Sequence, residues 1–260
     1  MSRGLQSCLG ALLALLALCF PAGAQVASAS SAERALEAYR AGSYELAHEL
    51  WRLELEAGES ASIGPVAALY NLGNASFRLR RPLEAAAWYT AALELAPRDE
   101  SIWHNLEFVR REAGLEPADR GDLSATARRF ASSLTLPESE RALLVIAGLF
   151  ALALVWEALR GGAAARACAL ALLGLLALAS VPWAWQLRQA GRDTLFVVQP
   201  EGAPLLSEPR SEAALVARLS PASEVERTDA LPGWWRVRTP EGATGWIADG
   251  GAIALRGPWR

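Results

Sequence analysis

The chain has 260 residues, a formal net charge of −3 and a hydrophobic content of 52%. This length allows more than one domain, and the apolar content is too high for a single ordinary soluble fold. Net acidity without a basic block argues against nucleic acid as a partner, because phosphate binding needs clustered cations.

The first 24 residues predict a secretion signal. Arg3 supplies a positive start, Leu9 to Phe20 form an apolar run, and small residues at 22–24 precede Gln25. The alternative is an uncleaved N-terminal anchor. We expect the mature chain to begin near Gln25, outside the cytoplasm.

Cysteines and histidines limit the chemistry available to the soluble segments. All three cysteines, Cys8, Cys19 and Cys168, lie in apolar blocks. The soluble segments therefore contain no thiol for a disulfide, a zinc site or a nucleophile. His48 lies in a His-Glu-x-x-Arg sequence that lacks the second histidine of a zinc protease. His104 has no carboxylate or cysteine at ligand spacing. We therefore expect no enzyme activity, catalytic residue, metal or cofactor.

Residues 25–115 have a helical pattern that repeats itself. Ala47 and Trp51 recur as Ala85 and Tyr89, and helix pairs with a period of about 34 residues are typical of tetratricopeptide repeats. The clearest repeat contains Leu69, Tyr70, Asn71, Leu72, Gly73, Asn74, Ala85, Tyr89, Ala92 and Pro97. Gly73 is small where the two helices meet, and Arg80 stands at the hairpin turn where glycine is usual.

The inner face of the first helices in such an array forms a groove for partner segments. Here we expect that groove to present Tyr70, Asn74, Phe77, Arg78, His104 and Asn105. The alternative for Phe77 is that its ring only packs the hairpin.

Residues 116–137 join the repeat to the next apolar block. Leu123, Ala127, Phe130 and Leu134 fall at helical spacing. This pattern favours either an amphipathic helix on the membrane surface or a linker helix packed on the repeat.

Two long apolar stretches predict transmembrane helices over residues 138–160 and 167–188. The connecting loop, 161–166, together with Arg160 before it carries two arginines and no acid, so the positive-inside rule places it in the cytoplasm. Arg188 and Arg192 after the second span weaken this charge bias, so the signal carries more weight. Trp156, Trp183 and Trp185 lie near the ends of the spans, where indole rings prefer the interface. Both flanking regions would then be periplasmic, in agreement with a cleaved signal.

Residues 193–256 show alternation and turns that predict a small β module. Strand candidates are 194–198, 214–219, 224–228, 234–237 and 245–248. The stretches Leu205 to Pro209, Gly233 to Arg238 and Gly242 to Ile247 resemble bacterial SH3-like (SH3b) domains. That resemblance implies a small barrel that binds cell-wall peptides or polypeptide segments.

Three tryptophans are the candidate ligand residues of this module: Trp234, Trp235 and Trp246. One of the adjacent pair must face outward because side chains alternate along a strand. The outward ring either binds a ligand or covers a neighbouring segment.

The order of parts resembles the E-type proteins of the Bacteroides aerotolerance (Bat) operon. The resemblance rests on Leu69 to Asn74, Ala92 to Pro97 and Trp103 to Leu106, followed by two spans and the SH3-like module. It implies an inner-membrane scaffold that associates with von Willebrand factor A-domain membrane proteins and a MoxR-type ATPase.

The expected fold class is a multidomain membrane protein with all-α tetratricopeptide hairpins, two transmembrane helices and a small all-β SH3-like barrel. The leading functional hypothesis is a non-enzymatic scaffold that assembles membrane and periplasmic proteins. The alternative is a cell-wall sensor or tether in which the SH3-like module binds peptidoglycan. An enzyme or transporter is the third possibility, and spans without polar faces argue against a transport path.

Overall fold

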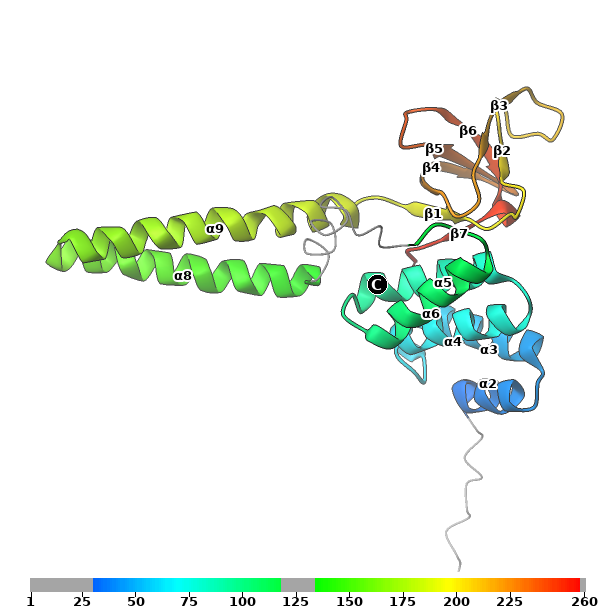
Figure 1. Ribbon diagram of the computed structural model, residues 1–260, viewed down its shortest axis with the longest axis horizontal. Helices are drawn as coiled ribbons and strands as arrows, with labels where there is room; N and C mark the ends of the chain where they lie inside the picture. Colours follow the sequence, from blue (N-terminus) through cyan, green and yellow to red (C-terminus); the bar gives the residue numbers. More distant parts are fainter. Residues whose placement is uncertain (1–29, 118–133, 258–260) are drawn as a thin grey trace, which may run out of the picture. The chain divides into compact units, whose positions relative to one another are not determined.

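The computed structural model describes residues 30–117 and 134–257 (Figure 1). The signal predicted over residues 1–24 and most of the join predicted over 116–137 lie outside the described residues. The described chain contains helix hairpins, two long apolar helices and an antiparallel sheet. These parts confirm the predicted multidomain fold class.

Five consecutive helices build the described repeat region, and each packs on the next. They are α2 (Ser31–Arg40), α3 (Tyr44–Ala57), α4 (Pro65–Arg78), α5 (Pro82–Leu95) and α6 (Glu100–Glu112). Pro65 and Pro82 stand in the first turns of α4 and α5, where the missing N–H does no harm. Asp99 caps α6 by accepting hydrogen bonds from the N–H groups of Ser101 and Ile102.

The α4–α5 hairpin closes through a small residue, as the sequence predicts. A Cβ atom on Gly73 would lie 2.6 Å from the Tyr89 ring, which is too close for any side chain. Leu69, Leu72 and Ala85 are fully buried around this contact. Gly73 is therefore a packing requirement of the hairpin rather than a flexible point.

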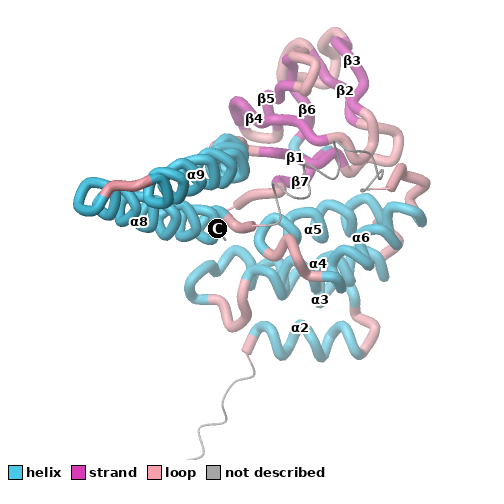
Figure 2. The backbone as a smooth tube through the Cα atoms, turned by 60° about the vertical axis from the view of Figure 1, so that its left-hand side comes forward, coloured by secondary structure: helices cyan, strands magenta, loops and turns pink. Residues whose placement is uncertain are grey.

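Two helices, α8 (Leu136–Arg160) and α9 (Ala163–Ala190), are long and apolar enough to cross a membrane. They run side by side in both Figure 1 and Figure 2. Their apolar side chains stay largely uncovered: Leu144 exposes 73% and Leu159 79% of its surface. A core helix of a soluble protein would bury such residues, so this hairpin indicates association with a membrane.

The turn between α8 and α9 is shorter than the loop predicted over 161–166. Gly161 and Gly162 alone connect the helices, with φ angles of 62° and 109° that favour glycine. Residues 163–166 already belong to α9, because the alanines that follow the glycines favour helix.

Seven strands form one antiparallel sheet in the order β3-β2-β6-β5-β4-β1-β7. They are β1 (Thr194–Val197), β2 (Ala203–Leu206), β3 (Leu215–Leu219), β4 (Glu224–Leu231), β5 (Trp234–Arg238), β6 (Thr244–Ala248) and β7 (Ala252–Ala254). The sequence prediction missed β2 and β7. Pro204 hides the strand pattern of β2, and β7 is too short to show alternation.

The hydrophobic core of the β module is formed by alternate residues of several strands. Leu195, Leu205, Val237 and Ile247 are almost fully buried in one cluster. Gly245 lets β6 approach β2, because a Cβ atom there would lie 2.7 Å from the Leu205 side chain. The glycine of the Gly-Trp-Ile sequence thus serves close packing between strands.

Candidate functional site: a helical groove and a tryptophan face

Helices α4 and α6 bring together most of the residues predicted to line the groove. Asn105 donates a hydrogen bond from Nδ2 to the Tyr70 hydroxyl at 3.0 Å, which joins the two helices. The Tyr89 hydroxyl donates to Asn74 Oδ1 at 2.7 Å. Asn74 therefore also serves the hairpin, whereas His104 is exposed on α6.

One end of this surface is aromatic. The rings of Phe77 and Phe108 meet edge to face with centroids 5.3 Å apart. The Arg111 guanidinium lies 6.0 Å from the Phe108 centroid, within the range of a cation–π contact. Phe77 thus packs within the repeat, while Phe108 keeps 38% of its surface exposed.

A second aromatic group continues the surface toward α2. The Tyr39 and Tyr44 rings are 5.3 Å apart, and the Arg78 guanidinium lies 4.9 Å from the Tyr44 centroid and donates a hydrogen bond to its hydroxyl. Burial raises the pKa of Tyr39, and the nearby Arg78 charge offsets part of this rise. Tyr39 and Tyr44 therefore both interact with the exposed Arg78 guanidinium on α4.

We call this set the aromatic–arginine row: Tyr39, Tyr44, Tyr70, Phe77, Arg78, Asn105, Phe108 and Arg111. The sequence prediction missed Tyr39, Tyr44, Phe108 and Arg111. Phe108 and Arg111 follow His104 and Asn105 at helical spacing, so continuing that face by one turn would have included them. The row offers stacking surfaces and two guanidinium groups rather than reactive groups.

Among the described residues, no cluster of three His, Cys, Asp or Glu side chains could hold a metal ion. His48 instead lies with its Nε2 atom 2.9 Å from the Glu84 carboxylate, between α3 and α5. Burial acts to raise the pKa of Glu84, but the contacts with His48 and the charge of Arg81 outweigh burial and lower it. This pair joins α3 to α5.

In the β module the three candidate tryptophans divide between two faces. Trp235 packs against the buried cluster and lies under the Arg227 guanidinium, 5.2 Å from the ring centroid. Trp246 pairs with Arg236 across β5 and β6, and Trp234 pairs with Ala248. Because paired residues share a face of the sheet, Trp234, Arg236 and Trp246 lie together on the face opposite Trp235.

The β module also contributes to the core of the repeat region. Phe196 of β1 and Leu255, just after β7, are almost fully buried in the same cluster as the repeat helices. Arg256 forms an ion pair through Nε and Nη2 with both carboxylate oxygens of Glu94 on α5. Strand β1 and the segment after β7 thus pack against the repeat helices.

Comparison with known protein families gives one match in the repeat region and one in the β module. Residues 66–99, which span α4, the turn and α5, match the family described as tetratricopeptide repeat. Residues 199–250 match the family described as bacterial SH3 domain. The chain thus contains one segment that is similar to tetratricopeptide repeats and one that is similar to bacterial SH3 domains. No curated protein matches the chain.

The two families define the general chemistry of the chain. Both are typically binding modules without catalytic activity, and they indicate protein–protein interaction with possible peptidoglycan binding. A bacterial SH3 domain beside two apolar helices also suggests membrane association with the module outside the cytoplasm. The aromatic–arginine row and the outward tryptophans are the candidate surfaces for such binding.

Proposed function

We propose that this protein is a non-enzymatic adaptor in the bacterial inner membrane, which gathers partner proteins through the groove of its tetratricopeptide repeat. The observation that carries this proposal is the aromatic–arginine row. Exposed Phe108 and Arg78 lie beside partly buried aromatic neighbours, and aromatic and arginine side chains dominate the energetics of protein interfaces.

The membrane position follows from α8 and α9 with the sequence charges. Exposed apolar side chains on both helices suit lipid, and the short connection carries arginine at its edges, Arg160 and Arg166. We propose on this basis that the connection lies in the cytoplasm, with the repeat and the SH3 domain in the periplasm. The signal predicted over residues 1–24, if it is cleaved, gives the same orientation.

The partners that we propose are those implied by resemblance to the Bat operon E-type proteins. They are von Willebrand factor A-domain membrane proteins and, through them, a MoxR-type ATPase system. The order of repeat, apolar hairpin and SH3 domain supports this proposal, because it matches the order in that family.

Affinity purification of the full chain from gently solubilised membranes tests the groove. The double variant Arg78→Ala/Phe108→Ala should recover co-purifying membrane proteins at least about tenfold less well, as expected for loss of interface anchors. Arg52→Ala is the matched control, since the partners of Arg52 among the described residues are Glu49 and Glu56, on an exposed face of its own helix α3. Equal recovery by the double variant and the control would contradict the proposed site.

A second function has its own support on the SH3 domain. Trp234 and Trp246 flank Arg236 on an outward face, and aromatic rings beside polar groups suit glycan or peptide contacts. We therefore keep a peptidoglycan tether as the alternative. In that case the full chain in detergent should sediment with purified sacculi, and Trp234→Ala/Trp246→Ala should abolish sedimentation while exposed Leu215→Ala does not.

A further inference from the structure

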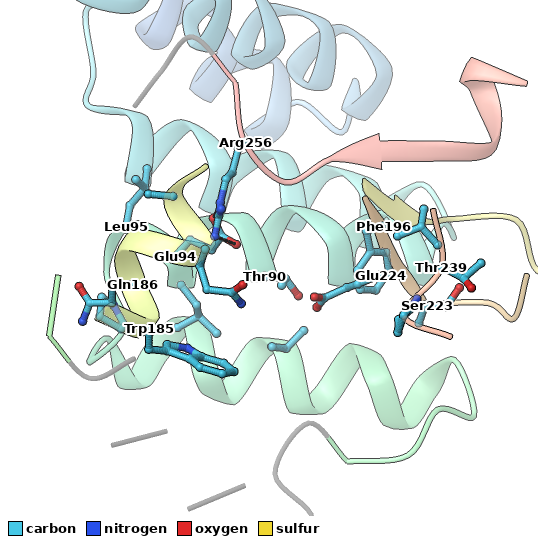
Figure 3. A pocket seen from close by; sticks show the side chains of 18 of the residues that line it. Thr90, Glu94, Leu95, Trp185, Gln186, Phe196, Ser223, Glu224, Thr239 and Arg256 are labelled. Carbon is cyan, nitrogen blue, oxygen red and sulfur yellow. Dashed lines mark hydrogen bonds and ion pairs between the residues drawn. The ribbon is translucent and has the colours of Figure 1, made fainter. Parts of the chain in front are cut away.

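Two arginines of the chain line the cavity shown in Figure 3, and both are engaged within the protein. Arg256 lies against Glu94 and bonds to both oxygens of that carboxylate. Arg110 donates from Nε to the Glu116 carbonyl at 2.9 Å. Both side chains therefore serve the fold rather than an outside partner.

The two arginines of the aromatic–arginine row differ, because acidic partners are missing there. Short connections make neighbouring helices of the repeat antiparallel, so α4 and α6 run in the same direction. Both carry arginine in their last turn, Arg78 in α4 and Arg111 in α6. Within the described chain, no carboxylate lies within ion-pair distance of either guanidinium. Their positive charge is therefore not neutralised by the fold.

Aromatic rings position both guanidinium groups without neutralising them. Arg78 lies 4.9 Å from the Tyr44 ring centroid and donates to its hydroxyl, which is an uncharged acceptor. Arg111 lies 6.0 Å from the Phe108 centroid. A guanidinium has five N–H donors, so the bond to Tyr44 leaves donors for a second acceptor. Both arginine side chains are exposed, and a carboxylate from outside can reach them.

An apolar contact links the two helix ends that carry these arginines. The rings of Phe77 and Phe108 meet with centroids 5.3 Å apart, and Phe108 exposes 38% of its surface. The axes of packed helices lie roughly 8–10 Å apart, a distance that about three residues of an extended chain cover. The surface therefore matches a segment in which an apolar side chain stands between two acidic ones.

We propose that the aromatic–arginine row binds an extended acidic segment of a partner protein, with side-chain carboxylates at Arg78 and Arg111 and an apolar side chain on Phe108. The inference rests on the proposed function and names the chemistry of the segment that the groove receives. Nucleic acid needs clustered cations, whereas these two arginines stand on separate helices in a chain with a net charge of −3. Two spaced carboxylates give each guanidinium one charge-assisted contact.

The test measures the binding of short fluorescent peptides to the full chain in an uncharged detergent, by fluorescence anisotropy. The acidic peptide has blocked ends, two glutamates about three residues apart and a tryptophan between them. Glutamine replaces glutamate in the neutral peptide, and arginine replaces it in the basic one. At low salt we expect the acidic peptide to bind about tenfold more tightly than the neutral one, the effect of two exposed ion pairs. An ionic strength of about 1 M should remove this difference, because the Debye length falls to about 3 Å.

Charge reversal separates recognition from folding. Arg78→Glu/Arg111→Glu should bind the basic peptide more tightly than the acidic one, an exchange of preference that an unfolded variant would not show. Arg78→Lys/Arg111→Lys keeps both charges and should keep the wild-type preference. The control with the same change in net charge is Arg34→Glu/Arg210→Glu, at exposed positions of α2 and of the connection between β2 and β3. This control should also keep the wild-type preference.

Two outcomes would overturn the inference. Equal binding of the acidic and neutral peptides by the wild type, including no binding of either, would mean that the row does not select acidic segments. An acidic preference that persists in Arg78→Glu/Arg111→Glu would place the recognition of charge outside the row. The proposed function fails by a different result, which is equal recovery of co-purifying membrane proteins by Arg78→Ala/Phe108→Ala and by the control Arg52→Ala.

Discussion

At the scale of single residues, the hairpin between α4 and α5 contains a backbone strain that glycine would remove. Arg80 has a φ angle of 62°, in the left-handed region that disfavours residues with a Cβ atom. The N–H groups of Arg80 and Arg81 nevertheless bond back to the carbonyls of Phe77 and Ser76, at 3.0 and 2.9 Å. These bonds close the end of α4 and hold Arg80 in the turn.

We therefore expect Arg80→Gly to stabilise the repeat by about 1 kcal/mol, because glycine adopts positive φ without steric cost. The measurement is the free energy of opening from amide hydrogen exchange in α4 and α5 of the full chain. Arg81→Gly is the control, since Arg81 has a φ of −113° and gains nothing from glycine. Equal or lower protection in Arg80→Gly would mean that the arginine side chain stabilises the turn in another way.

A second residue-scale property is the pH dependence that Glu84 gives the repeat. Its pKa is below the ordinary 4.5 in the folded state, so the unfolded state binds more protons as the pH falls below about 4.5. The stability from this carboxylate is present above pH 4.5 and is lost as the pH falls through the folded pKa. Hydrogen exchange of α3 and α5, corrected for intrinsic rates, should show this loss between pH 6 and pH 3.

Two variants isolate the role of Glu84. Glu84→Gln removes the titrating group, so the protection of α3 and α5 should depend less on pH than in the wild type. Glu37→Gln, at an exposed glutamate of α2, should leave the wild-type slope. If Glu84→Gln keeps the full slope, the acid sensitivity comes from other carboxylates.

At the scale of elements, the sequence predicts those parts of the fold that have strong periodic patterns. The α4–α5 hairpin follows from its apolar spacing, Gly73 and two prolines, and α8 and α9 follow from length and composition. The loop predicted over 161–166 is a turn of two residues, Gly161 and Gly162, and the strands β2 and β7 were not predicted. Such short elements carry little periodic signal. Contacts far apart in sequence, such as Phe77 with Phe108, have no local signature at all.

The same limit applies to the tryptophans of the SH3 domain. Alternation shows that Trp234 and Trp235 face opposite ways, but only the register of β5 with β6 decides which one points outward. Trp246, which could have been the core residue of Gly-Trp-Ile, shares the outward face. Its neighbour Ile247 fills the interior instead, with 1% of its surface exposed.

The adjacent pair Trp246 and Ile247 gives a prediction for this element. Ile247→Ala should destabilise the SH3 domain by about 2–5 kcal/mol because it leaves a cavity in the core. Trp246→Ala should cost less than half as much, although it removes the larger side chain, because the ring is only partly buried. Hydrogen exchange of β5 and β6 in the full chain measures both. A larger loss from Trp246→Ala would place its ring in the core and remove it from the ligand face.

At the scale of the whole molecule, the repeat and the SH3 domain share one hydrophobic cluster and are not separate modules. Phe196 and Leu255 join the buried cluster of the repeat helices, and Arg256 pairs with Glu94 across 162 residues of sequence. Arg256 also donates from Nη1 to the Arg192 carbonyl at 3.1 Å, which ties the end of β7 to the segment leaving α9. Binding at one module can therefore change the stability of the other.

The Arg256–Glu94 ion pair should carry a measurable part of this coupling. Only 12% and 21% of the two side chains are exposed, and two hydrogen bonds fix the geometry, so solvent screens the pair less than a surface pair. A double-mutant cycle with Arg256→Gln, Glu94→Gln and both together should give an interaction energy of about 1–3 kcal/mol. The readout is the opening free energy of β1 and β7 amides in the full chain. Each single variant should loosen α5 as well as β7, since each removes one charged member of the contact between them. Additive effects within about 0.5 kcal/mol, or loosening confined to one module, would mean that the repeat and the SH3 domain are stabilised independently.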